Sequence, residues 1–183
     1  MSGRAAAAAA VGAALLLAGC AQAAPPAPPP APTYEVAPLP VRPEEKALHP
    51  VPTADGDSEF RLIGLTTGIK TILGSHAEWP AKGAFIRIRV VVTNTGRNTV
   101  PFDANRQTLL TADGATHTPD PQAMLIKRQP GQIDIGADDR LEFDLYYDCA
   151  PDAQPTALRA FGGATLADFS DTTGVDIPIT PPT

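Results

Sequence analysis

Residues that bind metals or form disulfides are scarce in this sequence of 183 residues, which has two cysteines, three histidines and two methionines. A cupredoxin copper site needs a His and a Met shortly after its ligand Cys, and neither follows Cys149. The chain also lacks a Gly-x-Ser-x-Gly elbow, a Ser-x-x-Lys pair and a glycine loop that cradles phosphate. These absences exclude a cupredoxin and leave nucleophilic catalysis without a recognisable motif. We therefore expect a protein that is not an enzyme.

The remaining candidates for a chemical site are weak. His117 and Met124 lie close in sequence, but a solvated histidine and an apolar core methionine explain them more simply than a pair of copper ligands does. Asp134, Asp138 and Asp139 offer oxygen ligands in "DIGADD", without the ligand spacing of a known calcium loop. A solvated acidic turn is the simpler interpretation. We expect no bound metal and no cofactor.

The N-terminus contains the stretch "AAAAAAVGAALLLAGCAQ", which holds one of the two cysteines. Residues 5–17 form an apolar run of 13 after Arg4, which is typical of a secretory signal and shorter than the roughly 20 residues of a bilayer span. Leu17-Ala18-Gly19-Cys20 follows the pattern of a bacterial lipoprotein signal, in which the cysteine thiol receives the lipid. We therefore predict a signal peptide over residues 1–19 and lipidation at Cys20. Two acyl chains are enough to anchor such a chain stably to a membrane.

Removal of the signal leaves 164 residues, in which Cys149 is the only cysteine besides the lipidated one. Cys149 therefore has no partner for a disulfide within the chain. The 20 acidic and 13 basic residues give a charge of −7, which provides no electrostatic attraction to nucleic acid or to anionic lipid surfaces. Residues 21–52 contain 11 prolines, so we assign residues 20–53 to the lipidated cysteine and a disordered linker, and residues 54–183 to the folded domain.

Two segments of the expected domain alternate apolar and polar residues with the period of a β-strand. The segment "AFIRIRVVVTN" places its isoleucines on one face and Arg87 and Arg89 on the other. The segment "LEFDLYYDC" places Glu142 and Asp144 outward and directs Cys149 into the core. Because the outward side chains have opposite charges, we predict that these strands are antiparallel neighbours with exposed, opposed ion pairs.

Turn signals divide the rest of the domain into short strands. The segment "TLLTADGATHTP" predicts a hairpin with a type I′ turn at Asp113 and Gly114. Further strands are expected in "SEFRLIGLT", "TVPFDA", "QIDI", "TALRAFG" and "VDIPIT", and one helical turn is expected at "PQAMLI". Seven to nine short strands at this spacing predict an all-β fold, an immunoglobulin-like antiparallel β-sandwich.

The only tryptophan, Trp79, lies in a ten-residue connection between two predicted strands, residues 74–83, next to Glu78 and Pro80. Loops of sandwich domains often bind partners, and an exposed Trp can anchor a protein or stack on a sugar. Trp79 and Glu78 are therefore the candidate partner-binding residues. The alternative is that Trp79 folds back and covers an open end of the sandwich.

The blocks "AKGAFIRIRVVVTNTGRNTVPFDANRQTLLTADGATHTPD" and "PGQIDIGADDRLEFDLYYD" resemble a telokin-like family of bacterial exported and lipid-anchored domains, which includes secreted actinobacterial antigens. The matching features are Phe85 at the start of the long strand, Val92-Thr93-Asn94-Thr95-Gly96 at its end, Leu110 with Asp113-Gly114, the Pro130-Gly131 turn and the Phe143 strand. The resemblance implies an immunoglobulin-like fold outside the cell and implies no reaction.

These patterns together predict an exported lipoprotein that faces the cell envelope or the exterior. Its partners would be the membrane, through the lipid at Cys20, and an envelope protein or glycan bound by a non-catalytic module; no nucleic-acid partner is expected. The alternative is an extracytoplasmic carrier of a small ligand or a metal.

Overall fold

The computed structural model describes residues 40–48, 51–165, 169–170 and 173–180. The predicted signal peptide, Cys20 and most of the predicted linker lie outside these residues. Residues 39–183 form one compact unit. None of the helices in the described part of the chain has the length and apolar composition needed to cross a membrane.

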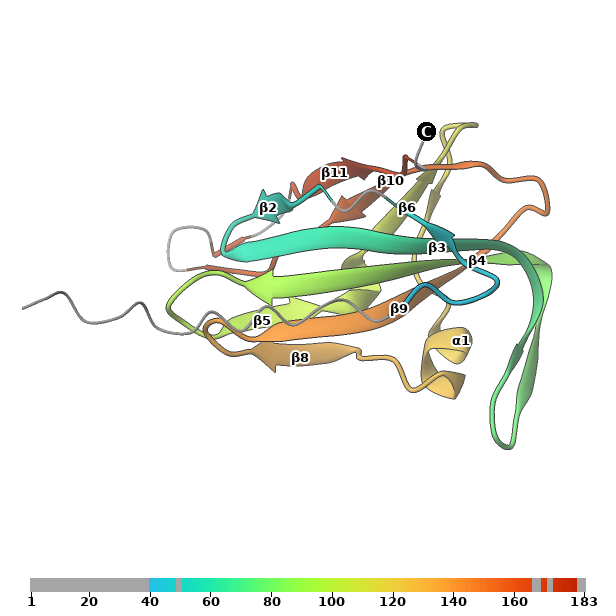
Figure 1. Ribbon diagram of the computed structural model, residues 1–183, viewed down its shortest axis with the longest axis horizontal. Helices are drawn as coiled ribbons and strands as arrows, with labels where there is room; N and C mark the ends of the chain where they lie inside the picture. The colour runs from blue at the N-terminus through green and yellow to red at the C-terminus, as the bar shows by residue number, and fades with distance from the viewer. Residues whose placement is uncertain (1–39, 49–50, 166–168, 171–172, 181–183) are drawn as a thin grey trace, which may run out of the picture. The chain divides into compact units, whose positions relative to one another are not determined.

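The described chain folds into an antiparallel β-sandwich, which confirms the predicted fold class (Figure 1). Its strands are β1 (Lys46–Ala47), β2 (Thr53–Asp55), β3 (Ser58–Leu73), β4 (Glu78–Asn94), β5 (Val100–Asp103), β6 (Thr108–Thr111), β7 (Thr116–His117), β8 (Gln132–Ile135), β9 (Arg140–Cys149), β10 (Pro155–Ala160) and β11 (Val175–Pro178). One sheet has the order β1-β3-β4-β9, with β2 also paired to β3. A second sheet has the order β11-β10-β6-β7, and β5 pairs with β8.

The described residues contain more strands than the seven to nine expected, because β1 and β2 have only two or three residues and show no alternating pattern. The helix α1 (Pro121–Ile126) forms where a helical turn was predicted. A single 3-10 turn, η1 (Ala104–Arg106), follows β5.

The hydrophobic core is built on alternate residues of the long strands β4 and β9. Ile88 of β4 and Leu145 of β9 pair directly and are fully buried, as the alternation predicts. Phe102 of β5 lies between Phe60 and Phe143, with ring centroids 6.2 and 5.8 Å apart. These aromatic contacts join β5 to the sheet that contains β3 and β9, and burial of such side chains is the main stabilising contribution.

The strands β4 and β9 are antiparallel neighbours, as the charge pattern predicts. The register places Arg89 directly opposite Asp144, and Arg87 opposite Tyr146. Arg89 Nη1 donates to Glu142 Oε1 at 3.1 Å. The expectation that these charged side chains are exposed is wrong, because Arg89 is only 1% exposed and Arg87 and Asp144 are also buried.

Residues 42–48, which we call the N-terminal strap, cover these charges. Arg89 Nη2 lies 2.8 Å from Glu45 Oε2 at the surface of the sheet. Arg42 Nη1 lies 2.8 Å from Asp144 Oδ2, so the beginning of the strap is held at β9. The strap supplies carboxylates to the arginines and excludes water from them, and β4 is therefore buried on both faces.

The strap corrects the N-terminal boundary of the domain. It continues as β1, in which Lys46 and Ala47 pair with Leu65 and Gly64 of β3. The run "EEKAL", residues 44–48, contains no proline, so its backbone can join a sheet although prolines occur on both sides. The folded domain therefore begins near residue 40 and not at residue 54.

Gly64 permits the close contact between the strap and the sheet. The Glu45 side chain lies directly over Gly64, and a Cβ at this position would collide with the Glu45 carboxylate. Glycine weakens the interior of a strand, so this close approach explains why a glycine stands in the middle of β3.

The hairpin of β6 and β7 forms where it was predicted, but its turn differs. Thr111 N donates to Ala115 O across the connection. Gly114 has a positive φ of 82°, whereas Asp113 does not have a positive φ, and a type I′ turn needs a positive φ at both central residues. Hydrogen bonds from the Thr111 hydroxyl and the Ala115 amide to the Asp113 carboxylate lower the pKa of Asp113.

Candidate functional site

The distal part of the β3–β4 hairpin, residues 67–82, extends beyond the sandwich, and we call it the arm (Figure 1). The turn of the arm is short, and Gly74 N donates to Ala77 O at 2.8 Å. The ten-residue loop predicted over residues 74–83 is therefore wrong, because β4 already begins at Glu78. Strand pairing in the arm continues through the segment that was assigned to a loop.

Both candidate partner-binding residues lie in the arm. Glu78 is exposed and pairs with Leu73, which is 56% exposed. Trp79 pairs with Ile72, so the two side chains lie on the same face of the hairpin. Ile72 is buried, whereas Trp79 is 36% exposed. The indole therefore lies beside a buried side chain of the arm and presents part of its apolar surface to solvent.

The helix α1 supports the arm. Its N-cap is Asp120, whose carboxylate accepts a hydrogen bond from Ala123 N at 2.8 Å. After the helix, Lys127 Nζ donates to Leu73 O in the arm at 2.9 Å. Leu125 of the helix is 70% exposed and adds another apolar side chain to this end of the domain.

Two glycines determine the path of the arm. Gly68 has a positive φ of 76° and lies in a register irregularity between Thr66 and Ile69. Gly74 packs against α1, and a Cβ there would lie 2.6 Å from Ile126 Cγ2. The arm therefore leaves the regular ladder near Gly68 and contacts the helix at its turn.

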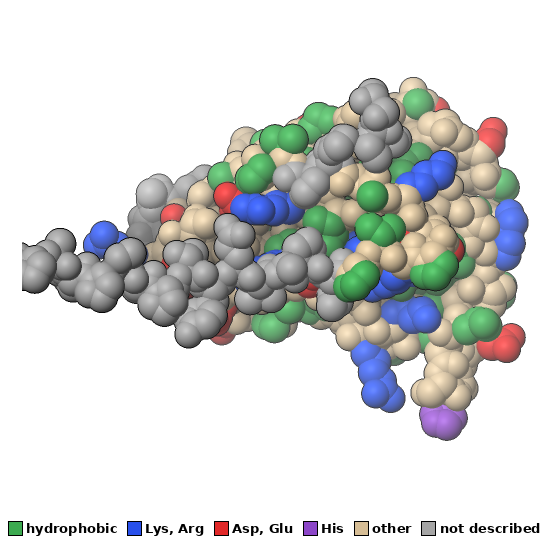
Figure 2. Space-filling model, in the orientation of Figure 1, with side chains coloured by type: hydrophobic (Ala, Val, Ile, Leu, Met, Phe, Trp, Pro, Cys, Tyr) green, Lys and Arg blue, Asp and Glu red, His purple; other side chains and the backbone are tan. Residues whose placement is uncertain are grey.

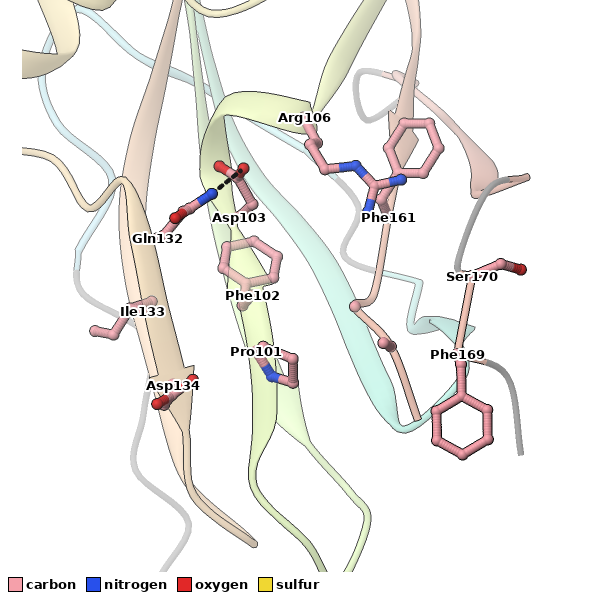
Figure 3. Close-up of a pocket in the computed structure, with 12 residues that line it drawn as sticks. Pro101, Phe102, Asp103, Arg106, Gln132, Ile133, Asp134, Phe161, Phe169 and Ser170 are labelled. Atoms are coloured by element: carbon pink, nitrogen blue, oxygen red, sulfur yellow. Dashed lines mark hydrogen bonds between the residues drawn. The ribbon is translucent and has the colours of Figure 1, made fainter. Parts of the chain in front are cut away.

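A hollow of about 540 Å³ lies beside β5 and β8 (Figure 3). The Arg106 guanidinium lies over the Phe161 ring, 4.7 Å from its centroid, which is a cation–π arrangement. Gln132 Nε2 donates to Asp103 Oδ2 at 3.1 Å. Phe169 adds an exposed aromatic ring. Aromatic surface beside charges of both signs suits a small amphipathic ligand.

Sequence reasoning missed this hollow because no local pattern marks it. Its lining comes from four short segments of the chain, residues 101–106, 132–134, 161–164 and 169–170. Pairing of β5 with β8 brings the first two together, and the described residues that follow β10 supply the others.

Cys149 points into the core, as the alternation of β9 predicts. It is 4% exposed. Burial, and to a smaller degree the charges of Asp148 and Asp113, raises the pKa of the Cys149 thiol to about 11. The thiol is therefore protonated at neutral pH, and the protonated form is the less reactive one.

The described residues contain no group of three or more His, Cys, Asp and Glu side chains that could hold a metal ion. Met124 is part of the hydrophobic core, whereas His117 lies near the β6–β7 turn with its Nε2 3.4 Å from Thr111 Oγ1. The side chains of Asp134, Asp138 and Asp139 are exposed to solvent. Cys20 lies outside the described residues, and its lipidation stays a prediction.

No protein-family description and no curated protein matches this chain. Solved structures similar to its fold include a conserved hypothetical protein from Bacillus anthracis, with 10% identity and a TM-score of 0.48 over 62% of this chain and 88% of that one. They also include MPT63, a secreted protein from Mycobacterium tuberculosis, with 17% identity and a TM-score of 0.43 over 73% of this chain and 92% of that one. An uncharacterized β-sandwich protein from Clostridium difficile has 12% identity and a TM-score of 0.41, over 70% of this chain and 95% of that one.

Proposed function

We propose that the chain is an exported protein that a lipid on Cys20 holds at the cell membrane, and that its sandwich is a non-catalytic interaction module of the cell envelope. The lipoprotein signal pattern at residues 17–20 supports export and lipidation. The resemblance of residues 81–120 and 130–148 to the telokin-like family supports the same location. The observation that carries the interaction role is the arm.

The arm places apolar side chains where they do not contribute fully to the core. Leu73 and Trp79 are both partly exposed there, and the backbone of the arm is fixed by pairing and by α1. Exposure of apolar area costs about 25 cal/mol per Å², and a Trp on a preformed element is the kind of residue that anchors a binding surface. The arm is therefore the proposed binding element, and its partner is a component of the envelope.

The chemistry of the described residues supports a role without catalysis. The Cys149 thiol is buried, and its raised pKa keeps it protonated. Ser75 and His76 are adjacent in the exposed turn of the arm, where they have neither burial nor a hydrogen bond to each other to activate the hydroxyl.

Site-specific photocrosslinking in intact cells tests the interaction role. A photoreactive residue at position 76 should give an envelope adduct, and Trp79→Ala and Leu73→Ser should reduce the yield severalfold. Ile133→Ala is the matched control, since Ile133 is an exposed apolar residue of β8, away from the arm. Circular dichroism confirms that each variant is folded. Adduct yields that are equal in all variants would refute the arm as the binding element.

A carrier of a small ligand is the second candidate, and the hollow beside β5 and β8 favours it. Arg106, Asp103 and Phe161 present a cation, a carboxylate and an aromatic ring to a volume of about 540 Å³. Native mass spectrometry of the purified protein, combined with metal analysis, tests this function. A stoichiometric small molecule that Phe161→Ala loses would support the carrier function, and an empty protein would count against it.

A further inference from the structure

Basic side chains are concentrated at the arm. Residues 67–82 and 121–129, which are the arm and α1 with the residues that follow it, contain four basic residues and one acidic residue. These are Lys70, Lys82, Lys127 and Arg128, with Glu78 as the acidic residue. The rest of residues 40–183 contains nine basic and 18 acidic residues. We call the surface of residues 67–82 and 121–129 the basic end of the domain.

The charges of the basic end are available to a partner. None of its four basic side chains forms an ion pair with a residue in the described part of the chain. The nearby carboxylates of Asp120 and Asp148 accept hydrogen bonds from the backbone amides of Ala123, and of Lys82 and Gly83. Figure 2 shows several basic side chains on the surface around the arm.

The opposite end of the domain carries more acidic than basic side chains, because Asp55, Asp57, Asp138 and Asp139 lie there with Arg97 and Arg140. The 17 residues of β4 run from the arm to Asn94, a length on the order of 50 Å at the usual rise of a strand. At that end, Asp138 N donates to Asn94 O at 3.0 Å, and Thr95 N donates to Asp57 O at 2.8 Å. Asp57 and Asp138 therefore lie far from the arm, and the domain has a basic end and an acidic end.

The described part of the chain begins beside the basic end. Arg42 of the strap is paired to Asp144, and Asp144 N donates to the side chain of Gln129 at 2.7 Å. Gln129 belongs to the segment that follows α1. Nineteen residues lie between Cys20 and Pro40, and a chain of this length spans at most about 70 Å, which is long enough for the basic end to reach a membrane that holds Cys20.

We propose that the basic end of the domain docks on the anionic headgroups of the membrane that holds the lipid anchor. This inference rests on the proposed function for the anchor and names the partner of the arm. Lysine and arginine side chains attract phosphate headgroups, and Trp is favoured at the membrane interface because its ring is apolar and its N–H is polar. Leu73, Trp79 and Leu125 supply the apolar surface for that layer. Repulsion of the acidic end directs it away from the membrane.

Vesicle binding of the chain from residue 20 onward, with Cys20→Ala, tests the docking without the anchor. This chain contains the whole compact unit of residues 39–183. Trp79 is the only tryptophan, so its fluorescence reports directly on the arm. We expect a blue shift and cosedimentation with vesicles of phosphatidylglycerol and phosphatidylcholine, quenching by brominated lipids, loss of binding in high salt, and no response to phosphatidylcholine alone.

Matched charge reversals separate docking by the arm from a general effect of net charge. Lys70→Glu with Arg128→Glu should weaken binding to anionic vesicles at least about tenfold. Arg61→Glu with Arg97→Glu changes the net charge equally outside the basic end, and binding should stay within about twofold. Circular dichroism confirms folding of both proteins.

Three results would overturn the proposal: no vesicle response, equal losses in the two charge-reversed proteins, or unquenched Trp79 fluorescence in bound protein. If vesicles are not bound while cells still give an arm-dependent adduct with a protein or glycan, the docking proposal fails and the interaction module stands. If vesicles are bound but Cys20 carries no lipid in cells, the anchor fails and the docking surface stands.

Discussion

At the scale of single residues, burial changes the chemistry of three side chains of β9, Cys149, Tyr146 and Tyr147, and it raises the pKa of the Tyr147 hydroxyl well above its usual value. Burial raises the pKa of the Cys149 thiol from 9.0 to about 11 and the pKa of the Tyr146 hydroxyl from 10.0 to about 12. A raised pKa means that the folded state favours the protonated form more than the unfolded state does. The stabilisation is therefore complete below pH 9 and decreases as pH rises through the interval from 9 to 12.

Cys149 allows a direct test of this linkage. We expect the thiol to be unreactive toward a thiol reagent at pH 8 in the folded protein and to react rapidly in denaturant, because it is buried and protonated. The free energy of unfolding from urea titrations should fall between pH 8.5 and 11, with about 2 kcal/mol of the decrease from Cys149 and about 1 kcal/mol from Tyr146. In Cys149→Ala, most of the decrease in the free energy of unfolding between pH 9 and 10 should disappear. Rapid labelling of the folded protein at pH 8 would contradict the buried position.

At the scale of secondary-structure elements, the strap explains most of the difference between expectation and structure. The opposite charges of β4 and β9 predict their pairing correctly, and the alternation predicts their inward residues correctly. It predicts exposure for Arg87 and Arg89, because a strand pattern does not reveal what lies on its polar face. The strap is hidden in the sequence since "EEKAL" is short and surrounded by proline. The one sequence signal of the strap is Gly64, a glycine inside a strand that the sequence alone does not explain.

A double-mutant cycle tests the contact between the strap and the sheet. Glu45→Ala leaves Arg89 with fewer carboxylates in a buried position and should destabilise the domain by about 3 kcal/mol. Gly64→Ala should also destabilise it, because the new methyl group would collide with Glu45. In the double variant, truncation of Glu45 leaves space for the new methyl group. The combined loss of unfolding free energy should therefore be smaller than the sum of the two single losses by about 1–2 kcal/mol.

The control for this cycle is Glu59→Ala, which removes a surface ion pair with Arg61 and should cost no more than about 1 kcal/mol. Urea unfolding of the wild type, the two single variants, the double variant and the control gives the free energy of unfolding of each protein. Strict additivity of Glu45→Ala and Gly64→Ala would show that the strap does not lie on Gly64 in solution.

The arm illustrates a second limit of sequence patterns. Pro80 and Gly83 punctuate the segment after Gly74 and indicate a loop, yet β4 continues through both residues and Pro80 pairs with Thr71. The partner residues Thr71 and Ile72 are good strand formers, and in the arm β4 pairs only with β3. Pro80 therefore lies on an edge strand, where its missing N–H is tolerated. Trp79 was identified from its type and from its place in an expected loop, while its position on a projecting hairpin depends on pairing that the turn signals concealed.

At the scale of the whole molecule, net charge is a poor guide to the partner. A charge of −7 for the chain after signal removal argues against anionic lipid, but it averages over two ends with opposite signs. The hollow shows the same limit, because its lining residues are assembled by the fold from distant segments. The sequence therefore predicts the strands and the export signal. It does not predict features that depend on contacts between distant segments, such as the strap over the sheet and the lining of the hollow.

The membrane attachment of the whole protein should then have a strong and a weak component. Two acyl chains on Cys20 give stable anchoring, whereas the basic end alone gives an attraction that salt screens. In cells, the wild-type protein should stay with the membrane fraction during a high-salt wash, and Cys20→Ala should be released by it. In low salt, part of the Cys20→Ala protein should remain bound, and adding Lys70→Glu and Arg128→Glu should release that part as well. Retention of Cys20→Ala after the high-salt wash would show that something other than the lipid holds the protein.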